Sequence, residues 1–143
     1  MERMLEDHLY FAILQARWLD DENWEKGPSH FFDGAPEGVA AGARERVRQA
    51  LHSHGLGRHR NEEIVELSTR SIDALSMLLG DKPYLFGDEL CGADATAFAF
   101  VAAASTPFFD SSLRKAIESH AKLIAYRDRM MERYYPDMAR KAA

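Results

Sequence analysis

The stretch from Phe86 to Ser105, FGDELCGADATAFAFVAAAS, places one carboxylate, that of Asp94, at the head of an almost unbroken apolar run. The run from Ala95 to Ala104 is too short to cross a membrane, which requires about 20 apolar residues. It therefore predicts a buried core helix and no membrane span.

A helix that starts inside a core needs a local acceptor, because its first four N–H groups have no partner within the helix. If Cys91 is the cap residue, Asp94 occupies the third helical position, from which its carboxylate reaches back to the N–H of the cap. Loss of Asp94 would then cost roughly 1–3 kcal/mol. This structural role accounts for Asp94 better than a role as a general acid or base.

Length and composition limit what the chain can be. The 143 residues, 46% hydrophobic and 29% charged, suit one globular domain over residues 1–143. A net charge of −5 argues against nucleic-acid binding. One cysteine excludes an intramolecular disulfide, and no secretory signal opens the chain, so we expect a cytoplasmic protein.

The first half of the chain predicts two helices and a loop. Apolar residues recur at three- and four-residue steps over residues 1–24, as in a long amphipathic helix. Glu25–Gly38 is rich in glycine and proline and predicts a loop. Pro36 is expected in the first turn of the next helix, which Gly55 ends.

The second half predicts further helices. One begins at a capping Asn61 and ends at Gly80, and a short one beyond Pro107 starts near Asp110 or Ser112. A last helix is expected to be capped by Ser119 and stopped by Pro136. No segment alternates as a strand does, so we predict an all-α bundle of about five or six helices.

These residues resemble a known family. The motif GDELCGAD (residues 87–94), leading into a buried helix, resembles the capping box of the C-terminal helical domain of glutathione S-transferases. The stretches at residues 4–24, 54–64, 72–94 and 120–137 are similar, in the same order, to the branch that includes failed axon connections proteins, metaxins and their bacterial relatives. One position departs from the family, which usually has Thr or Ser where this chain has Cys91.

The resemblance carries functional implications. In this superfamily an N-terminal thioredoxin-like domain binds glutathione and supplies the catalytic residue, whereas the helical domain supplies much of the co-substrate pocket. The sequence contains no βαβ pattern, so we expect the thioredoxin-like domain to be absent from residues 1–143 and assign no catalytic residue. The chain alone should neither bind a cofactor nor catalyse transfer.

Two functions remain open from the sequence. The chain is either the co-substrate side of a glutathione transferase-like enzyme for small apolar electrophiles, or a non-catalytic scaffold of the metaxin type that docks a protein. Its partner would be a thioredoxin-like domain, covalent or separate, and a homodimer is a further option. The apolar first helix is expected under both hypotheses.

Several residues are candidates for a substrate or partner surface. Tyr10, Phe11 and Trp18, with Trp24, are large aromatic residues, although core packing explains them nearly as well. Arg17, with His8 on the same helix, is placed to meet an anionic ligand, against the simpler reading of ordinary surface residues.

Two other groups of residues are less informative. His52, His54 and His59 lie close in sequence, but no cysteine or carboxylate completes a familiar metal site, so we predict no metal. Cys91 at a helix start is a candidate reactive thiol, and a structural thiol is the favoured interpretation.

Overall fold

Helices account for all the regular structure that is described. The computed structural model describes residues 1–142, and side chains as far as residue 139. It contains no strand within that range, so the predicted all-α class is confirmed. Within this range, none of the helices combines the length and the apolar character that crossing a bilayer requires.

The N-terminal helix consists of three segments that follow one another without a break. These are α1 (Glu2–Met4), a π-helical turn η1 (Leu5–Leu9) and α2 (Tyr10–Trp18). The helix stops at Trp18 and does not continue to residue 24 as predicted. A second helix, α3 (Asp21–Lys26), begins here because Asp20 is its N-cap: Asp20 Oδ1 accepts the backbone N–H of Asn23 at 2.9 Å.

Residues 21–54, which begin with α3, form an arm of the molecule. The predicted loop, residues 25–38, includes the end of α3 and a short 3₁₀ helix, η2 (Pro28–Phe32), before α4 (Val39–His54) begins. The prediction that Pro36 lies in the first turn of this helix is wrong. Gly38, with a φ of 85°, is the residue before the helix, and a side chain there would be strained. Gly55 ends α4 with a φ of 111°, as predicted.

The longest helix is α5 (Asn61–Leu79), which follows the short 3₁₀ helix η3 (Leu56–Arg58). Its cap is Arg60 and not the predicted Asn61, because Glu63 reaches back and accepts the backbone N–H of Arg60 at 2.9 Å. Gly80 ends the helix with a φ of 57°, as expected.

The last four helices are α6 (Gly92–Ala104), α7 (Ser112–Glu118), α8 (Ala121–Tyr134) and α9 (Pro136–Ala142). Ser119 is the C-cap residue of α7, and His120 is the N-cap residue of α8. The prediction that Ser119 caps the last helix at its start is therefore wrong. Pro136 follows α8 and starts α9. With α1–α2 taken as one helix, eight helices are described instead of five or six, because α3 and α9 were not predicted.

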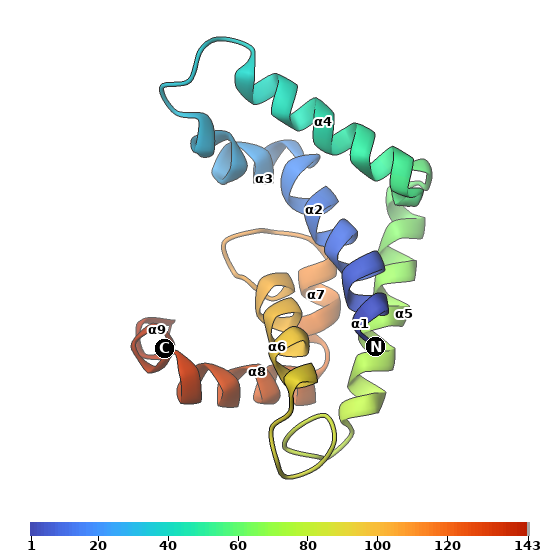
Figure 1. The fold of residues 1–143 in the computed structure, drawn as a ribbon, viewed down its shortest axis with the longest axis vertical. Helices are drawn as coiled ribbons and strands as arrows, with labels where there is room; N and C mark the ends of the chain where they lie inside the picture. The colour runs from blue at the N-terminus through green and yellow to red at the C-terminus, as the bar shows by residue number, and fades with distance from the viewer. Residues whose placement is uncertain (143) are drawn as a thin grey trace.

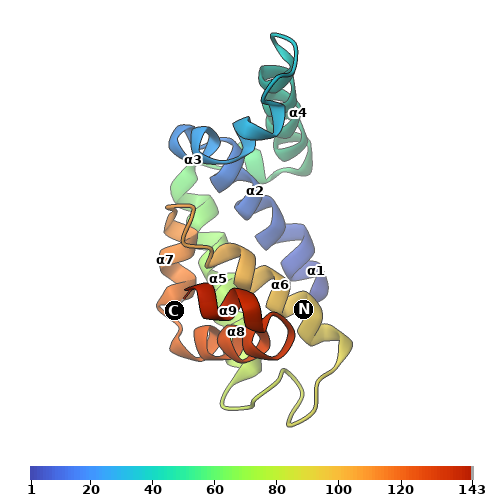
Figure 2. The same ribbon diagram turned by 90° about the vertical axis from the view of Figure 1, so that its left-hand side faces the viewer.

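The helices form a bundle with an arm at one end. Figure 1 shows a bundle formed by α2, α5, α6, α7 and α8. The helices α3 and α4 lie at the end opposite α8 and α9. Figure 2 shows the arm projecting beyond the bundle. One core cluster joins both halves of the chain and includes Leu5, Leu9, Leu51, Ile72, Leu75, Ala97, Val101, Ile117 and Leu123.

Candidate functional site

The start of α6 is organised around the buried carboxylate of Asp94. Oδ2 accepts the backbone N–H of Cys91 at 2.9 Å, and Oδ1 accepts that of Leu85, also at 2.9 Å. The Tyr126 hydroxyl lies 2.9 Å from the Asp94 carbonyl oxygen and 3.1 Å from Oδ1. Asp94 thus connects the start of α6 with the preceding loop and with α8.

Hydrogen bonding decides the charge of this carboxyl. Burial by itself raises the pKa of Asp94, but the N–H groups of Leu85 and Cys91, with the Cys91 thiol and the Tyr126 hydroxyl, hold that pKa below its ordinary value. Burial and the neighbouring Asp94 charge raise the pKa of Tyr126. Asp94 is fully inaccessible to solvent, so this arrangement favours a structural role over proton exchange with a substrate.

Cys91 differs from the hydroxyl residue that is usual in the family. Its side chain is exposed, and its thiol donates to Asp94 Oδ2 at 3.3 Å. The capping box is therefore present at α6, and the carboxylate of Asp94 accepts both the backbone N–H and the thiol of the cap residue.

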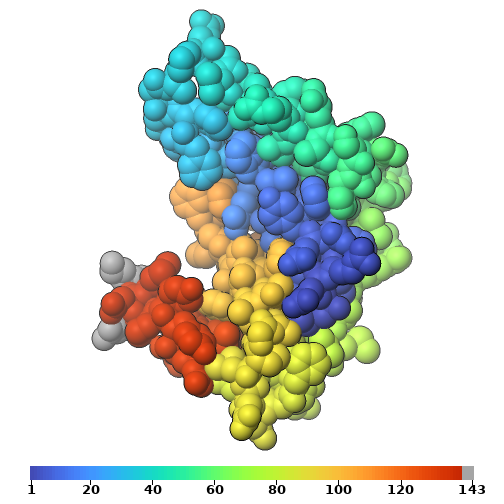
Figure 3. Space-filling model, viewed as in Figure 1, coloured from blue at the N-terminus to red at the C-terminus, as the bar shows by residue number. Residues whose placement is uncertain are grey.

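The middle of α6 presents an uncharged face to solvent. Sequence analysis predicted a helix buried on all sides, and this is wrong, because Ala95 and Ala99 are exposed and Ala102 is half-buried. These three residues, spaced four and three apart, share one side of the helix and are called the α6 face here. Asp94 is the one charged residue of α6. Figure 3 shows α6 open to this side, between the N-terminal helix and α8–α9.

A helix that is apolar on all sides is usually covered on all sides. Here Ala97 and Val101 pack into the core, while the opposite, equally apolar side meets water. Next to it Phe98 stacks on Tyr135, with ring centroids 6.0 Å apart, and Tyr135 is 48% exposed. The α6 face and this aromatic pair together form an uncharged surface on the bundle.

The four predicted surface residues separate into two pairs. Tyr10 and Arg17, seven residues apart, share one side of the N-terminal helix, and Phe11 and Trp18 share the next. Tyr10 is exposed, and Arg17 donates to the Ala103 carbonyl oxygen of α6 at 2.6 Å.

The second pair packs against the arm. Phe11 stacks on His54 of α4, with ring centroids 3.7 Å apart, and Trp18 lies 5.5 Å from Trp24 by the same measure. Phe31 and Phe32 of η2 complete the aromatic cluster around Trp18. The structure therefore brings Arg17 into contact with α6, whereas the rings of Phe11 and Trp18 pack against residues of α3, η2 and α4.

Arg17 is a half-buried cation without an ion pair among the described side chains. Its guanidinium lies 4.7 Å from the centroid of the Phe109 ring, and burial lowers its pKa. The carbonyl oxygen of Ala103, near the negative end of α6, provides partial compensation.

The histidines do not assemble into a metal centre. His54 is stacked on Phe11, and His59 lies 3.7 Å from Glu63. Within the described part of the chain, no three His, Cys, Asp or Glu side chains are arranged to hold a metal ion.

Sequence reasoning missed two buried polar anchors. Tyr126 has no role in the sequence analysis, and its contact with Asp94 joins residues 32 positions apart. Asn23 is almost fully buried and bonds to the backbone of Asp110, 87 positions away. The local sequence around Tyr126 or Asn23 does not identify a partner so distant along the chain.

Comparison with known proteins agrees with the family resemblance. Residues 69–130 match the family described as the glutathione S-transferase C-terminal domain. The chain is 39% identical over 103 residues to an isoprene-epoxide–glutathione S-transferase of Rhodococcus sp. (strain AD45). It is 36% identical over 90 residues to Failed axon connections of Drosophila melanogaster. The resemblance to the C-terminal domain of glutathione S-transferases is confirmed.

The matches cover much of this chain but less of its relatives. The first covers 67% of the chain and 43% of the Rhodococcus enzyme, and the second covers 61% of the chain and 22% of the Drosophila protein. The chain thus corresponds to less than half of either relative. No solved structure matches it significantly.

Proposed function

We propose that this chain is the co-substrate side of a glutathione transferase-like protein and that the α6 face packs against a thioredoxin-like domain. The main support is the 39% identity to the Rhodococcus enzyme, whose name specifies an epoxide and glutathione. That enzyme is also longer than the region matched here, so it has additional chain that such a domain would occupy.

The α6 face supports the docking part of the proposal. Exposed Ala95 and Ala99 allow a second backbone to approach closely, and no charged side chain of α6 on that side would need desolvation. Burial of this surface would give α6 the all-round cover that its composition predicts.

The neighbouring side chains support the pocket part. The Phe98–Tyr135 pair gives α6 an aromatic surface suited to a small apolar electrophile, and Arg17 adds a positive charge at the helix end. Tyr10, exposed on the same side of its helix as Arg17, adds a further aromatic ring. Under this proposal glutathione and the group that activates its thiol belong to the partner domain. The chain alone then contributes binding surface and no catalytic residue.

The test uses the product of the whole reading frame, including any coding sequence before Met1. Retention on immobilised glutathione and conjugation of glutathione to an isoprene epoxide are measured for that product and for residues 1–143 alone. We expect activity only in the longer product. Turnover by residues 1–143 alone, or a longer product that neither binds nor turns over, would contradict the proposal.

A matched pair of variants tests the α6 face. Ala99→Glu places a charge at its centre, whereas Ala50→Glu changes an exposed alanine of α4. We expect only Ala99→Glu to reduce glutathione retention of the longer product, with both variants folding normally by circular dichroism. Equal retention by the two variants would show that this face is not used.

A second candidate is a non-catalytic module that docks a protein through the same face, and it is kept because the name of the Drosophila relative specifies no transferase. This function predicts that the longer product neither binds glutathione nor conjugates it, yet Ala99→Glu still weakens association with the partner. The two candidates therefore differ in their glutathione readout.

A further inference from the structure

A cleft of about 340 Å³ lies away from the α6 face, between α2, α5 and α7. None of its lining residues belongs to α6, α8 or α9. Its apolar part includes Ala12 and Ala16 of α2, with Ile64 of α5 and Leu113 of α7. The two alanines, four positions apart, leave space where larger side chains would fill the gap between the helices.

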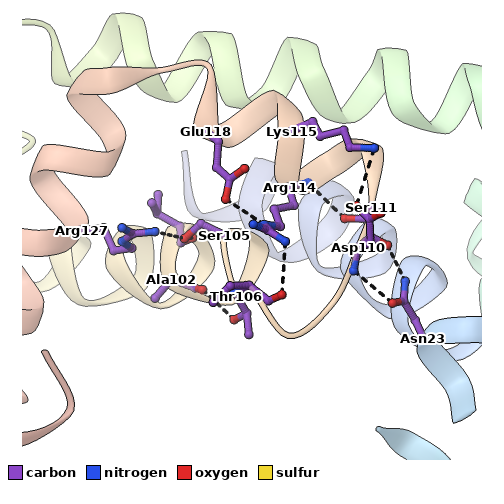
Figure 4. Close-up of polar contacts among 12 residues, drawn as sticks. Asn23, Ala102, Ser105, Thr106, Asp110, Ser111, Arg114, Lys115, Glu118 and Arg127 are labelled. Atoms are coloured by element: carbon purple, nitrogen blue, oxygen red, sulfur yellow. Dashed lines mark hydrogen bonds and ion pairs between the residues drawn. The ribbon is translucent and has the colours of Figure 1, made fainter. Parts of the chain in front are cut away.

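One wall of the cleft is held by the buried amide of Asn23. Nδ2 donates to the carbonyl oxygens of Ala16 at 2.9 Å and Asp110 at 2.7 Å, and Oδ1 accepts the N–H of Asp110 at 3.2 Å. Figure 4 shows Asn23 against Asp110, beside Ser111, whose hydroxyl caps α7. Hydrogen bonds between Asn23 and Asp110, which are 87 positions apart in sequence, hold this wall in place. The cleft is therefore part of the tertiary structure.

A buried acceptor without a donor belongs to the lining. Gln15 Nε2 donates to Asn61 Oδ1 at 2.8 Å, whereas Gln15 Oε1 is inaccessible and has no hydrogen-bond partner. A buried acceptor in this state is destabilising, and a donor reaching it would remove the cost.

The charges of the cleft are negative. Its lining includes three aspartates and no Lys, Arg or His. Asp21 pairs with Arg44 at 2.7 Å and Asp110 with Lys115 at 3.6 Å, whereas Asp20 has no ion pair among the described side chains. Asp20 Oδ1 accepts only the cap hydrogen bond from Asn23, so its carboxylate retains acceptor capacity.

We propose that this cleft binds a small primary amine with a short apolar stem. The ammonium group carries three donors and one positive charge, which match Asp20 and Gln15 Oε1. Because Gln15 Oε1 is inaccessible in this structure, the Gln15 side chain has to turn toward the cleft before this oxygen accepts a hydrogen bond from the ligand. The stem lies against Ala12, Ile64 and Leu113.

Three ligands with the same ring test the ligand class: benzylamine, benzyl alcohol and benzoate. Each is titrated into ¹⁵N-labelled residues 1–143 at neutral pH and low salt, and amide shifts are followed by NMR. We expect benzylamine to shift amides around Gln15, Asp20 and Val65, with an affinity in the millimolar range typical of so small a ligand. The other two ligands should bind at least about tenfold more weakly, since one lacks the charge and the other reverses it.

Two variants test the contacts. Asp20→Asn removes the charge but retains a good cap for α3, so the fold should survive while benzylamine binding weakens about tenfold. Asp88→Asn, an equal charge change at an exposed residue outside the cleft, should bind as the unmodified chain does. Val65→Phe, which places a larger side chain in the lining, should abolish binding with Asp20 intact.

Each alternative result would overturn the proposal. If benzyl alcohol bound as tightly as benzylamine, the cleft would bind only the apolar ring and not the amine. If benzoate bound more tightly than benzylamine, the N–H groups at the starts of α5 and α7 would be binding an anion. Shifts that are absent, or that persist in Val65→Phe, would show that the cleft is not an amine site.

Discussion

The starts of α5 and α6 use the same device in different surroundings. At α5, Glu63 accepts the backbone N–H of Arg60 at 2.9 Å, and its side chain remains 41% exposed. At α6, Asp94 accepts the backbone N–H of Cys91 at the same distance and is completely buried. The two caps have the same hydrogen-bond distance, but only the carboxylate at α5 is accessible to water.

This difference determines how much each cap contributes to stability. The backbone and side-chain hydrogen bonds of Arg60 lower the pKa of Glu63, but water can replace the carboxylate if it is lost. At α6 Asp94 is inaccessible to water, so without its side chain the backbone N–H groups of Leu85 and Cys91 would lose their acceptor, and the Tyr126 hydroxyl would keep only the carbonyl oxygen of residue 94. The same kind of hydrogen bond is thus expected to contribute little to stability at α5 and much more at α6.

Asp94→Ala should have the largest effect. Removing the acceptor of the Leu85 and Cys91 backbone N–H groups costs about 3 kcal/mol, and the melting temperature should fall by about 10 °C. Thermal unfolding followed by circular dichroism measures this change. A melting curve like that of the unmodified chain would mean that other acceptors satisfy the start of α6.

Acid should weaken the α6 cap as well. Because the folded-state pKa of Asp94 is depressed, its ionised form stabilises the fold above its unfolded pKa of about 4, and this contribution is lost as pH falls through the folded value. The gap in unfolding free energy between the unmodified chain and Asp94→Asn should therefore narrow from pH 7 to pH 3. Urea titrations at both pH values provide the measurement, and a constant gap would contradict the assignment.

Tyr126→Phe should have an intermediate effect. The ring still fills its site in the core, but one buried hydrogen bond to Asp94 is lost, at about 1 kcal/mol. The melting temperature should fall by about 3 °C. A decrease as large as that of Asp94→Ala would show that the hydroxyl, more than the backbone N–H groups, holds the carboxylate.

Glu63→Ala should have the smallest effect and sharpens the comparison. It removes the equivalent carboxylate at α5, where water reaches the freed N–H group, so the melting temperature should change by about 1 °C or less. If Glu63→Ala and Asp94→Ala were equally destabilising, burial would not be what distinguishes the two caps.

Several helix boundaries could be predicted because they depend on neighbouring residues. Gly55 and Gly80 end helices with positive φ, and Cys91 with Asp94 starts α6, as their local pattern indicates. The incorrect caps, Asn61 and Ser119, are each displaced by one residue. In both cases the neighbour, Arg60 or His120, occupies the cap position, and side-chain preference alone does not distinguish adjacent positions.

The exposed α6 face could not be predicted from composition. A helix that is apolar all round indicates burial, but which side meets the core depends on how the other helices pack. Similarly, the seven-residue spacing places Tyr10 with Arg17, yet only the packing puts Arg17 against α6 and Trp18 against the arm.

The sequence by itself determined the helical class, the family resemblance and the reciprocal cap of Asp94, since these depend on residues a few positions apart on a helical backbone. The tertiary structure alone decided that Tyr126 completes the Asp94 network, that Asn23 and Asp110 wall a cleft, and that one side of α6 stays open. These contacts join residues tens of positions apart, so their geometry is fixed by the packing of the whole bundle and not by local propensity.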